Sequence, residues 1–244
     1  MSRYTAETDW DQAGCMLQRD CDIYASAPLR RLLDDQTRVM ATDLQRCFGT
    51  HGLLLSATVN DAPPALPLLG NWTRLWVSNH RYRGDLRATA DEPLPFIDDA
   101  FELVLLRHAL EVVAAPTAVL AEAVRVLAPG GVLVVTGVHP LSGWAPWFWW
   151  RTRGRQRALQ VPLRLSHGLQ QAGLEIERAQ RVGQTWPVGT ATPGPTGANV
   201  WGGGYVLIAR KRRRMVTPLR IKPVPVRVPA NSRLSPGTRR SSTL

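Results

Sequence analysis

Residues 101–136 read FELVLLRHALEVVAAPTAVLAEAVRVLAPGGVLVVT, and this stretch decides the fold. The runs at 101–106 and 132–136 are almost wholly apolar, which is typical of strands covered on both faces in a parallel sheet. Between them, residues 116–127 place Val, Leu and Ala side chains on one face of a helix. The Pro-Gly-Gly turn at 129–131 ends that helix. Strand, helix, turn and strand form a βαβ unit, so the sequence predicts an α/β protein.

Further patterned segments extend this unit in both directions along the chain. The expected elements are helices at 28–48, 65–69 (short) and 165–172, and strands at 52–59, 74–78, near 86–89, at 174–179 and at 205–209. Residues 137–164 and 184–204 are expected to be loops. We therefore predict a Rossmann-like, doubly wound, mostly parallel sheet with helices on both faces. The domain is expected at 28–210, between a polar N-terminal extension at 1–27 and a basic, disordered tail at 211–244.

The charge is distributed unevenly along the chain. The protein has 244 residues and a formal net charge of +11. Residues 1–177 contain 17 Lys and Arg against 19 Asp and Glu, whereas residues 178–244 contain 13 Lys and Arg and no acidic residue. The positive charge is therefore a property of the tail and not of the domain, and any polyanion contact is expected there.

The composition also argues against several classes of protein. No run of eighteen apolar residues is present, so no transmembrane segment is expected. The N-terminus, MSRYTAETDWDQAG, lacks the basic start and apolar stretch of a signal peptide. Cys15, Cys21 and Cys47 lack the spacing of a metal or redox site, so we expect free thiols, no metal and a cytoplasmic location.

Short motifs follow one another in a fixed order between residues 94 and 137. They are LPF at 94–96, DD at 98–99, FELV at 101–104, HALE at 108–111 and RVLAPGG at 125–131. This ordered set resembles the methyltransferase type 11 family, of the class I S-adenosylmethionine-dependent type, and a bacterial subgroup of it with a degenerate cofactor loop. The resemblance is strongest over 85–137. It implies an antiparallel last strand, S-adenosylmethionine as cofactor, and transfer of a methyl group to an acceptor.

The resemblance implies three contacts with the cofactor, and the sequence departs from the family pattern at each. The loop after the first strand is normally rich in glycine, but residues 53–69 contain none, and Ser56 and Ala57 are its smallest residues. The second strand is followed by Asn79 where the family has an acid for the ribose. Asp91 lies one residue later than the usual adenine-binding Asp. We therefore predict weak or no cofactor binding, centred on these four residues.

Two polar residues follow the 101–106 strand, at the edge where ligands bind in such sheets. His108 is expected as a cofactor-pocket or proton-handling residue, or as a histidine held by structural hydrogen bonds. Arg107 either reaches an anion or is solvated. No catalytic residue is assigned, because methyl transfer is an in-line displacement that can depend on proximity and orientation alone.

Residues 144–157 read WAPWFWWRTRGRQR, an unusual concentration of tryptophan and arginine. This segment either packs as a cap on the sheet edge or binds an acidic or aromatic substrate, an anionic membrane surface or RNA. The first functional hypothesis is a methyltransferase with an unknown small-molecule or macromolecular acceptor. The alternative is a catalytically lapsed fold, a binding or scaffold protein that contacts a polyanion through this segment and the tail.

Overall fold

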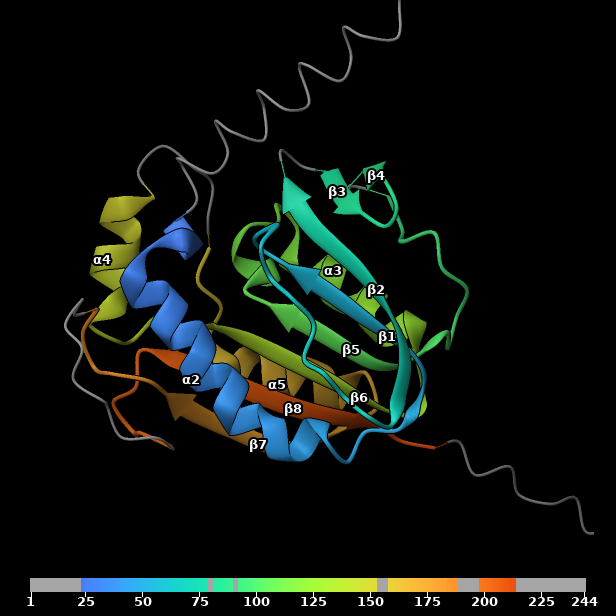
Figure 1. The fold of residues 1–244 in the computed structure, drawn as a ribbon. Coiled ribbons are helices and arrows are strands. Elements are labelled where there is room, and N and C mark those ends of the chain that lie inside the picture. The colour runs from blue at the N-terminus through green and yellow to red at the C-terminus, as the bar shows by residue number, and fades with distance from the viewer. Residues whose placement is uncertain (1–22, 79–80, 90–91, 153–157, 188–197, 214–244) are drawn as a thin grey trace, which may run out of the picture. The chain divides into compact units, whose positions relative to one another are not determined.

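The computed structural model describes residues 23–78, 81–89, 92–152, 158–187 and 198–213 (Figure 1). Its elements are η1 (Ile23–Ala25), α2 (Ala27–Leu44), β1 (Gly49–Ser56), β2 (Leu69–Ser78), β3 (Arg81–Gly84), β4 (Ala88–Thr89), β5 (Phe101–Arg107), η2 (Ala109–Glu111), α3 (Pro116–Val126), β6 (Leu127–Val138), α4 (Trp144–Arg151), α5 (Pro162–Gln171), β7 (Leu174–Val182) and β8 (Gly204–Lys211). The apolar runs of the sequence form the central strands, where both faces are covered.

The strands form one sheet in the order β4-β3-β2-β1-β5-β6-β8-β7. β2, β1, β5 and β6 are mutually parallel, whereas β8 runs antiparallel to both β6 and β7. β5 is central, because Leu103 and the residues after it pair with β1 on one side and β6 on the other. The predicted Rossmann-like, mostly parallel sheet with an antiparallel last strand is confirmed.

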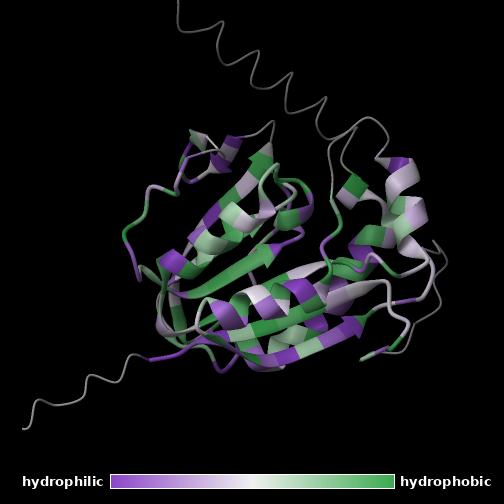
Figure 2. Ribbon diagram, turned by 180° about the vertical axis from the view of Figure 1, so that it is seen from behind, coloured by the Kyte–Doolittle hydropathy of each residue, from purple (hydrophilic) through white to green (hydrophobic). Residues whose placement is uncertain are grey.

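Helices cover both faces of the sheet, α2 on one and α3 and α5 on the other (Figure 1). Met40 of α2 packs in a cluster with Leu105 of β5. On the opposite face, Val119 of α3 and Leu169 of α5 share a cluster with Leu106. Successive strand residues point to opposite faces, so one apolar run supplies both cores. Figure 2 shows this hydrophobic character in the central strands.

The connection between β1 and β2, residues 57–68, contains no helix. The short helix expected at 65–69 is absent, and β2 begins at Leu69. Pro63, Pro64 and Pro67 explain the difference, because proline lacks a backbone N–H and restricts the residue before it. The connection therefore follows an irregular path, with Leu66 buried against the α2 side of the sheet.

After β2 the chain turns back along the sheet edge. β3 pairs antiparallel with β2, and β4 pairs antiparallel with β3. The strand expected near 86–89 is observed as the short β4. Tyr82 of β3 is buried in the same cluster as Leu75 and Val77 of β2, which fixes the hairpin to the core. Within the described residues from 81 to 100, no helix lies between β2 and β5.

The predicted loop at 137–164 is wrong in part, because it contains helix α4 and the start of α5. Trp144 and Phe148, one helical turn apart, are both buried and pack with Tyr24. The Trp144 indole donates to the Gln184 carbonyl at 2.8 Å. It also lies so close to Gly203 that an added Cβ there would come within 2.1 Å of the indole. These contacts come from distant parts of the sequence, which explains why local pattern did not predict the helix.

The packed region is slightly longer than the 28–210 expected from the sequence. Ile23 and Tyr24 of η1 are 6% and 2% exposed, so packing begins before α2. Lys211 ends β8 and donates through Nζ to the carbonyls of Val124 and Leu127, at 2.8 and 2.6 Å. Residues 1–22 and 214–244 lie outside the described residues, so the expected extension and tail stay predictions. Within the described chain, no helix combines the length and apolar character needed to cross a membrane.

Candidate functional site

The carboxyl ends of β1, β5 and β6 meet at one edge of the sheet, here called the strand-end edge (residues 56–61, 107–111 and 136–138). Ligands of open α/β sheets bind at such an edge. Ser56 is buried there, and its hydroxyl donates to the Thr58 carbonyl at 2.8 Å. The Ala57 N–H donates to the Arg107 carbonyl at 3.1 Å. The structure places both predicted residues at this edge, but their polar atoms are engaged within the chain.

Arg107 is buried beneath α2, so its interpretation as a solvated residue is wrong. Its Nη1 forms an ion pair with Asp61 Oδ1 at 2.9 Å, and its Nη2 donates to Thr37 Oγ1 at 3.0 Å. Asp61 belongs to the irregular 57–68 connection, so this pair ties the connection to β5 and α2. Burial raises the pKa of Asp61 above its ordinary value, against the opposing attraction of the Arg107 guanidinium. A buried arginine favours a carboxylate partner, and here the chain supplies that carboxylate.

His108 is the centre of a buried hydrogen-bond network. Its Nδ1 lies 3.1 Å from Glu111 Oε2, and its Nε2 lies 2.9 Å from Gln36 Oε1. The Tyr24 hydroxyl donates to the same Glu111 oxygen at 2.6 Å. The Gln36 amide donates to the Gly137 carbonyl at 3.1 Å, which links α2 to β6. Both ring nitrogens of His108 are therefore engaged, which favours the structural interpretation of this residue.

Three buried polar atoms at this edge have no hydrogen-bond partner within the described part of the chain. They are Asp61 Oδ2, Arg107 Nε and Thr136 Oγ1. Arg107 and Thr136 are register partners on β5 and β6, so their side chains lie on the same face of the sheet. Buried polar atoms without partners are costly unless a water or ligand satisfies them. A polar ligand at this edge would be stabilised by these atoms.

The remaining predicted contacts, Asn79 and Asp91, lie outside the described residues and stay predictions. Two residues of the edge, and Gln36 of α2 beside it, were not identified from the sequence as parts of a site. Glu111 stood in the HALE motif, and Asp61 lies within the glycine-free segment 53–69, where nothing in the sequence singled it out. Gln36 gave no signal, because its partner His108 lies 72 positions away.

S-adenosylmethionine carries an amino-acid group, a ribose and an adenine, and each needs partners. Arg107 has the chemistry to bind the carboxylate of the amino-acid group, but Asp61 occupies its Nη1. The Ser56 hydroxyl and the Ala57 N–H are engaged elsewhere. On the amino-acid side, the described residues therefore fit the cofactor poorly as long as Asp61 stays paired with Arg107.

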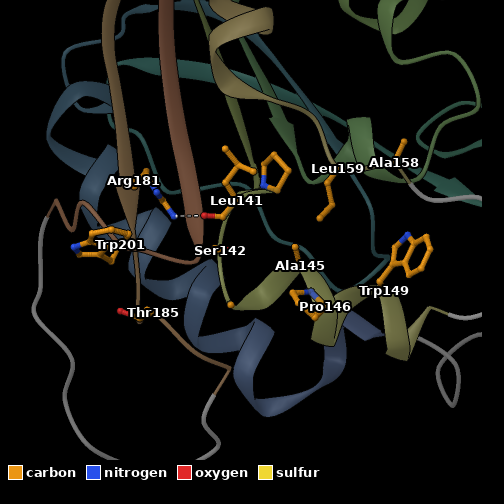
Figure 3. A pocket seen from close by; sticks show the side chains of 12 residues that line it. Leu141, Ser142, Ala145, Pro146, Trp149, Ala158, Leu159, Arg181, Thr185 and Trp201 are labelled. Atoms are coloured by element: carbon orange, nitrogen blue, oxygen red, sulfur yellow. Dashed lines mark hydrogen bonds between the residues drawn. The ribbon is translucent and has the colours of Figure 1, made fainter.

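A separate cavity of about 790 Å³ lies beyond the carboxyl end of β6, and we call it the α4 pocket (Figure 3). Its lining residues are Pro140, Leu141, Ser142, Gly143, Ala145, Pro146, Trp149, Ala158, Leu159, Arg181, Thr185 and Trp201. The wall is mostly apolar. Arg181 is the one ionisable side chain among these described lining residues.

Comparison with known proteins gives one family and several similar folds. Residues 73–135 match the model of the methyltransferase domain family. No curated protein matches the chain. A solved S-adenosylmethionine-dependent methyltransferase from Thermotoga maritima is 23% identical, with 52% of this chain and 63% of that chain covered and a TM-score of 0.45. Another, from Mesorhizobium loti, is 15% identical, with 78% and 100% covered and a TM-score of 0.44.

The likenesses to solved structures carry no information about the acceptor. This chain spans only 63% of the Thermotoga protein. The family match is more informative, because it runs from within β2 to within β6 and includes the whole of the central strand β5. Residues 73–135 of the chain are therefore similar to the methyltransferase domain family.

Proposed function

We propose that this protein is an S-adenosylmethionine-dependent methyltransferase with weak affinity for its cofactor and a methyl acceptor that its family does not define. The observation that carries the proposal is the family match at 73–135, which includes the central strand β5 and the edge residues 107–111 that follow it. The proposed cofactor contacts are Ser56, Ala57, Asn79, Asp91 and His108. A cytoplasmic location is part of the proposal, in keeping with the free thiol of Cys47.

Internal competition at Arg107 gives a physical reason for weak affinity. The carboxylate of the cofactor would need the guanidinium that Asp61 already holds at 2.9 Å. Binding would then require Asp61, in the 57–68 connection, to separate from Arg107. The free energy needed for that separation weakens the apparent binding of the cofactor. The partnerless Nε of Arg107 and Oγ1 of Thr136 support a polar group entering at this position.

Calorimetry with S-adenosylhomocysteine, the demethylated product, tests the proposal. We expect a dissociation constant weaker than about 100 μM for the unaltered protein. Asp61→Asn should tighten binding roughly tenfold, because a neutral amide competes less well for Arg107. Ala57→Leu should abolish binding by occlusion, and Asp91→Ala should weaken it roughly tenfold, about the value of one charged hydrogen bond. Submicromolar binding that none of these substitutions changes would place the cofactor elsewhere.

A second function, a binding or scaffold protein without turnover, is favoured by one observation. The network of Tyr24, Gln36, His108 and Glu111 closes the strand-end edge with the chain's own side chains. In this alternative the exposed Trp149 and Trp150 of α4 and the basic segment 211–244 contact a polyanion. Absence of cofactor binding in the unaltered protein and in Asp61→Asn, together with salt-sensitive retention on heparin that is lost on removal of 214–244, would favour it.

A further inference from the structure

The α4 pocket lies on a different side of α4 from the buried network. Trp144 and Phe148 face the core, where Phe148 packs against Tyr24 with ring centroids 6.4 Å apart. Trp149 instead lines the pocket. The helix therefore separates the pocket from the strand-end edge, and nothing in the proposed cofactor site accounts for the pocket.

The apolar wall of the pocket is exposed to solvent. Trp149, Trp201 and Leu141 are 76%, 70% and 78% exposed, although each contributes to the wall of a hollow. Large apolar side chains gathered around a concavity are typical of binding sites for small molecules. Figure 3 shows Trp149 and Trp201 at opposite ends of the pocket, with Leu141 and Leu159 between them. An elongated apolar ligand could contact both indoles.

Arg181 gives the pocket a positive charge at the Trp201 end (Figure 3). Its Nη2 donates to the Leu141 carbonyl at 3.1 Å and its Nε donates to the Gly202 carbonyl at 3.1 Å. These bonds fix the guanidinium beside the pocket and engage two of its five N–H groups. No acidic residue is among the described residues that line the pocket, so the charge there is not neutralised by the wall.

We propose that the α4 pocket binds a small amphiphilic anion, with its acidic group near Arg181 and Trp201 and its apolar body extending towards Trp149. The apolar wall and the cavity size select the body, and charge complementarity selects the acidic group. This inference goes beyond methyl transfer and does not depend on it, because the pocket and the cofactor edge are formed by different residues.

Calorimetry with decanoate and with decylammonium tests the proposal, because the two probes differ mainly in the sign of the charge. We expect decanoate to bind at least about tenfold more tightly, and affinity across the octanoate-to-decanoate series to rise about fourfold per methylene. Trp149→Ala and Trp201→Ala should each weaken decanoate binding about tenfold. Trp150→Ala is the matched control, because Trp150 is exposed on the same helix but does not line the pocket.

Arg181→Gln should remove the preference for decanoate over decylammonium, and Arg181→Lys should retain it. Thermal melting of each variant establishes that the fold is intact. Equal binding of the two probes by the unaltered protein would overturn the proposal, as would decanoate binding that neither tryptophan substitution weakens. No S-adenosylmethionine is added in any of these titrations, so the results do not depend on methyltransferase activity.

Discussion

Arg107 and Arg125 are 18 positions apart in the sequence, and each connects separate segments of the chain through hydrogen bonds and ion pairs. Arg107 does so in a buried environment and Arg125 in a partly exposed one. Arg125 of α3 is partly exposed, and it pairs with Glu122 at 2.8 Å and with Asp98 at 2.6 Å. It also donates to the carbonyls of Leu94 and Phe96, both at 2.9 Å. These bonds fasten the segment before β5 to α3, and we call this group the Arg125 staple.

The Arg107 group is buried and incompletely satisfied, whereas the Arg125 staple is partly exposed and its described polar partners lie 3 to 31 positions from Arg125. Leu94, Phe96, Asp98 and Arg125 are also residues of the motifs that carry the family resemblance. The family match therefore depends in part on residues that connect the segment before β5 to helix α3. The strand-end edge can diverge independently, since none of the staple contacts depends on Ser56, Ala57 or Asp61.

The sharpest test removes one glutamate from the Arg125 staple and one from the buried His108 network, which lies beside Arg107 at the strand-end edge. Glu111 is 1% exposed and accepts from Tyr24 and from the Val138 N–H. Glu111→Ala should cost about 3–5 kcal/mol of unfolding free energy, because it leaves buried donors without acceptors. Glu122→Ala, in the partly exposed staple, should cost only about 1–2 kcal/mol. Urea denaturation monitored by circular dichroism measures both.

Equal losses of unfolding free energy in Glu111→Ala and Glu122→Ala would mean that the buried network stabilises the fold no more than the Arg125 staple does. A small loss in Glu111→Ala alone would show that water replaces the missing carboxylate, and that the strand-end edge is more open than its burial indicates.

The sequence predicted the sheet more completely than the site, for a physical reason. Central strands such as 101–106 and 132–136 are contiguous apolar runs, so the information that specifies them is local. The buried network joins Tyr24 to Glu111 across 87 positions and Gln36 to His108 across 72, and no local pattern encodes those distances. Helix α4 was missed for the same reason, because its buried face depends on Gly203.

Replacing the buried ion pair tests whether its charge is needed for folding. Asp61→Leu should cost about 3 kcal/mol, because it leaves the Arg107 guanidinium buried without its carboxylate. The double variant Asp61→Leu/Arg107→Met should recover to within about 1 kcal/mol of the unaltered protein, since apolar pairs of similar volume often replace buried ion pairs. Chemical denaturation of the four proteins completes the double-mutant cycle. No recovery in the double variant would mean that Thr37 and the 57–68 connection need Arg107 itself.

Arg125→Gln should weaken the staple without affecting ligand binding. We expect a loss of about 2 kcal/mol, because two charged pairs and two carbonyl contacts disappear from a partly exposed site. The affinity for S-adenosylhomocysteine should stay the same, since the staple is separate from the strand-end edge. Arg38→Gln is the matched control, because Arg38 makes a single exposed pair with Asp35 and should lose at most about 0.5 kcal/mol. A change in ligand affinity in Arg125→Gln would show that the two regions are coupled.

The smallest expected effect is the pH dependence of the staple. The hydrogen bond from Arg125 lowers the pKa of Glu122 below its ordinary value of 4.5. A carboxyl group with a lowered pKa in the folded state stabilises the protein above its unfolded pKa, and that contribution is lost as the pH falls through the folded pKa. The difference in unfolding free energy between the unaltered protein and Glu122→Gln should therefore be constant, at about 1 kcal/mol, above about pH 5.5. It should shrink as the pH falls below 4.5, because both proteins then come to carry a neutral group at this position. Groups remote from the staple contribute equally in the two proteins and cancel in the difference. A difference that persists unchanged at the lowest pH would show that the shape of the glutamate side chain, and not its charge, holds Arg125 in place.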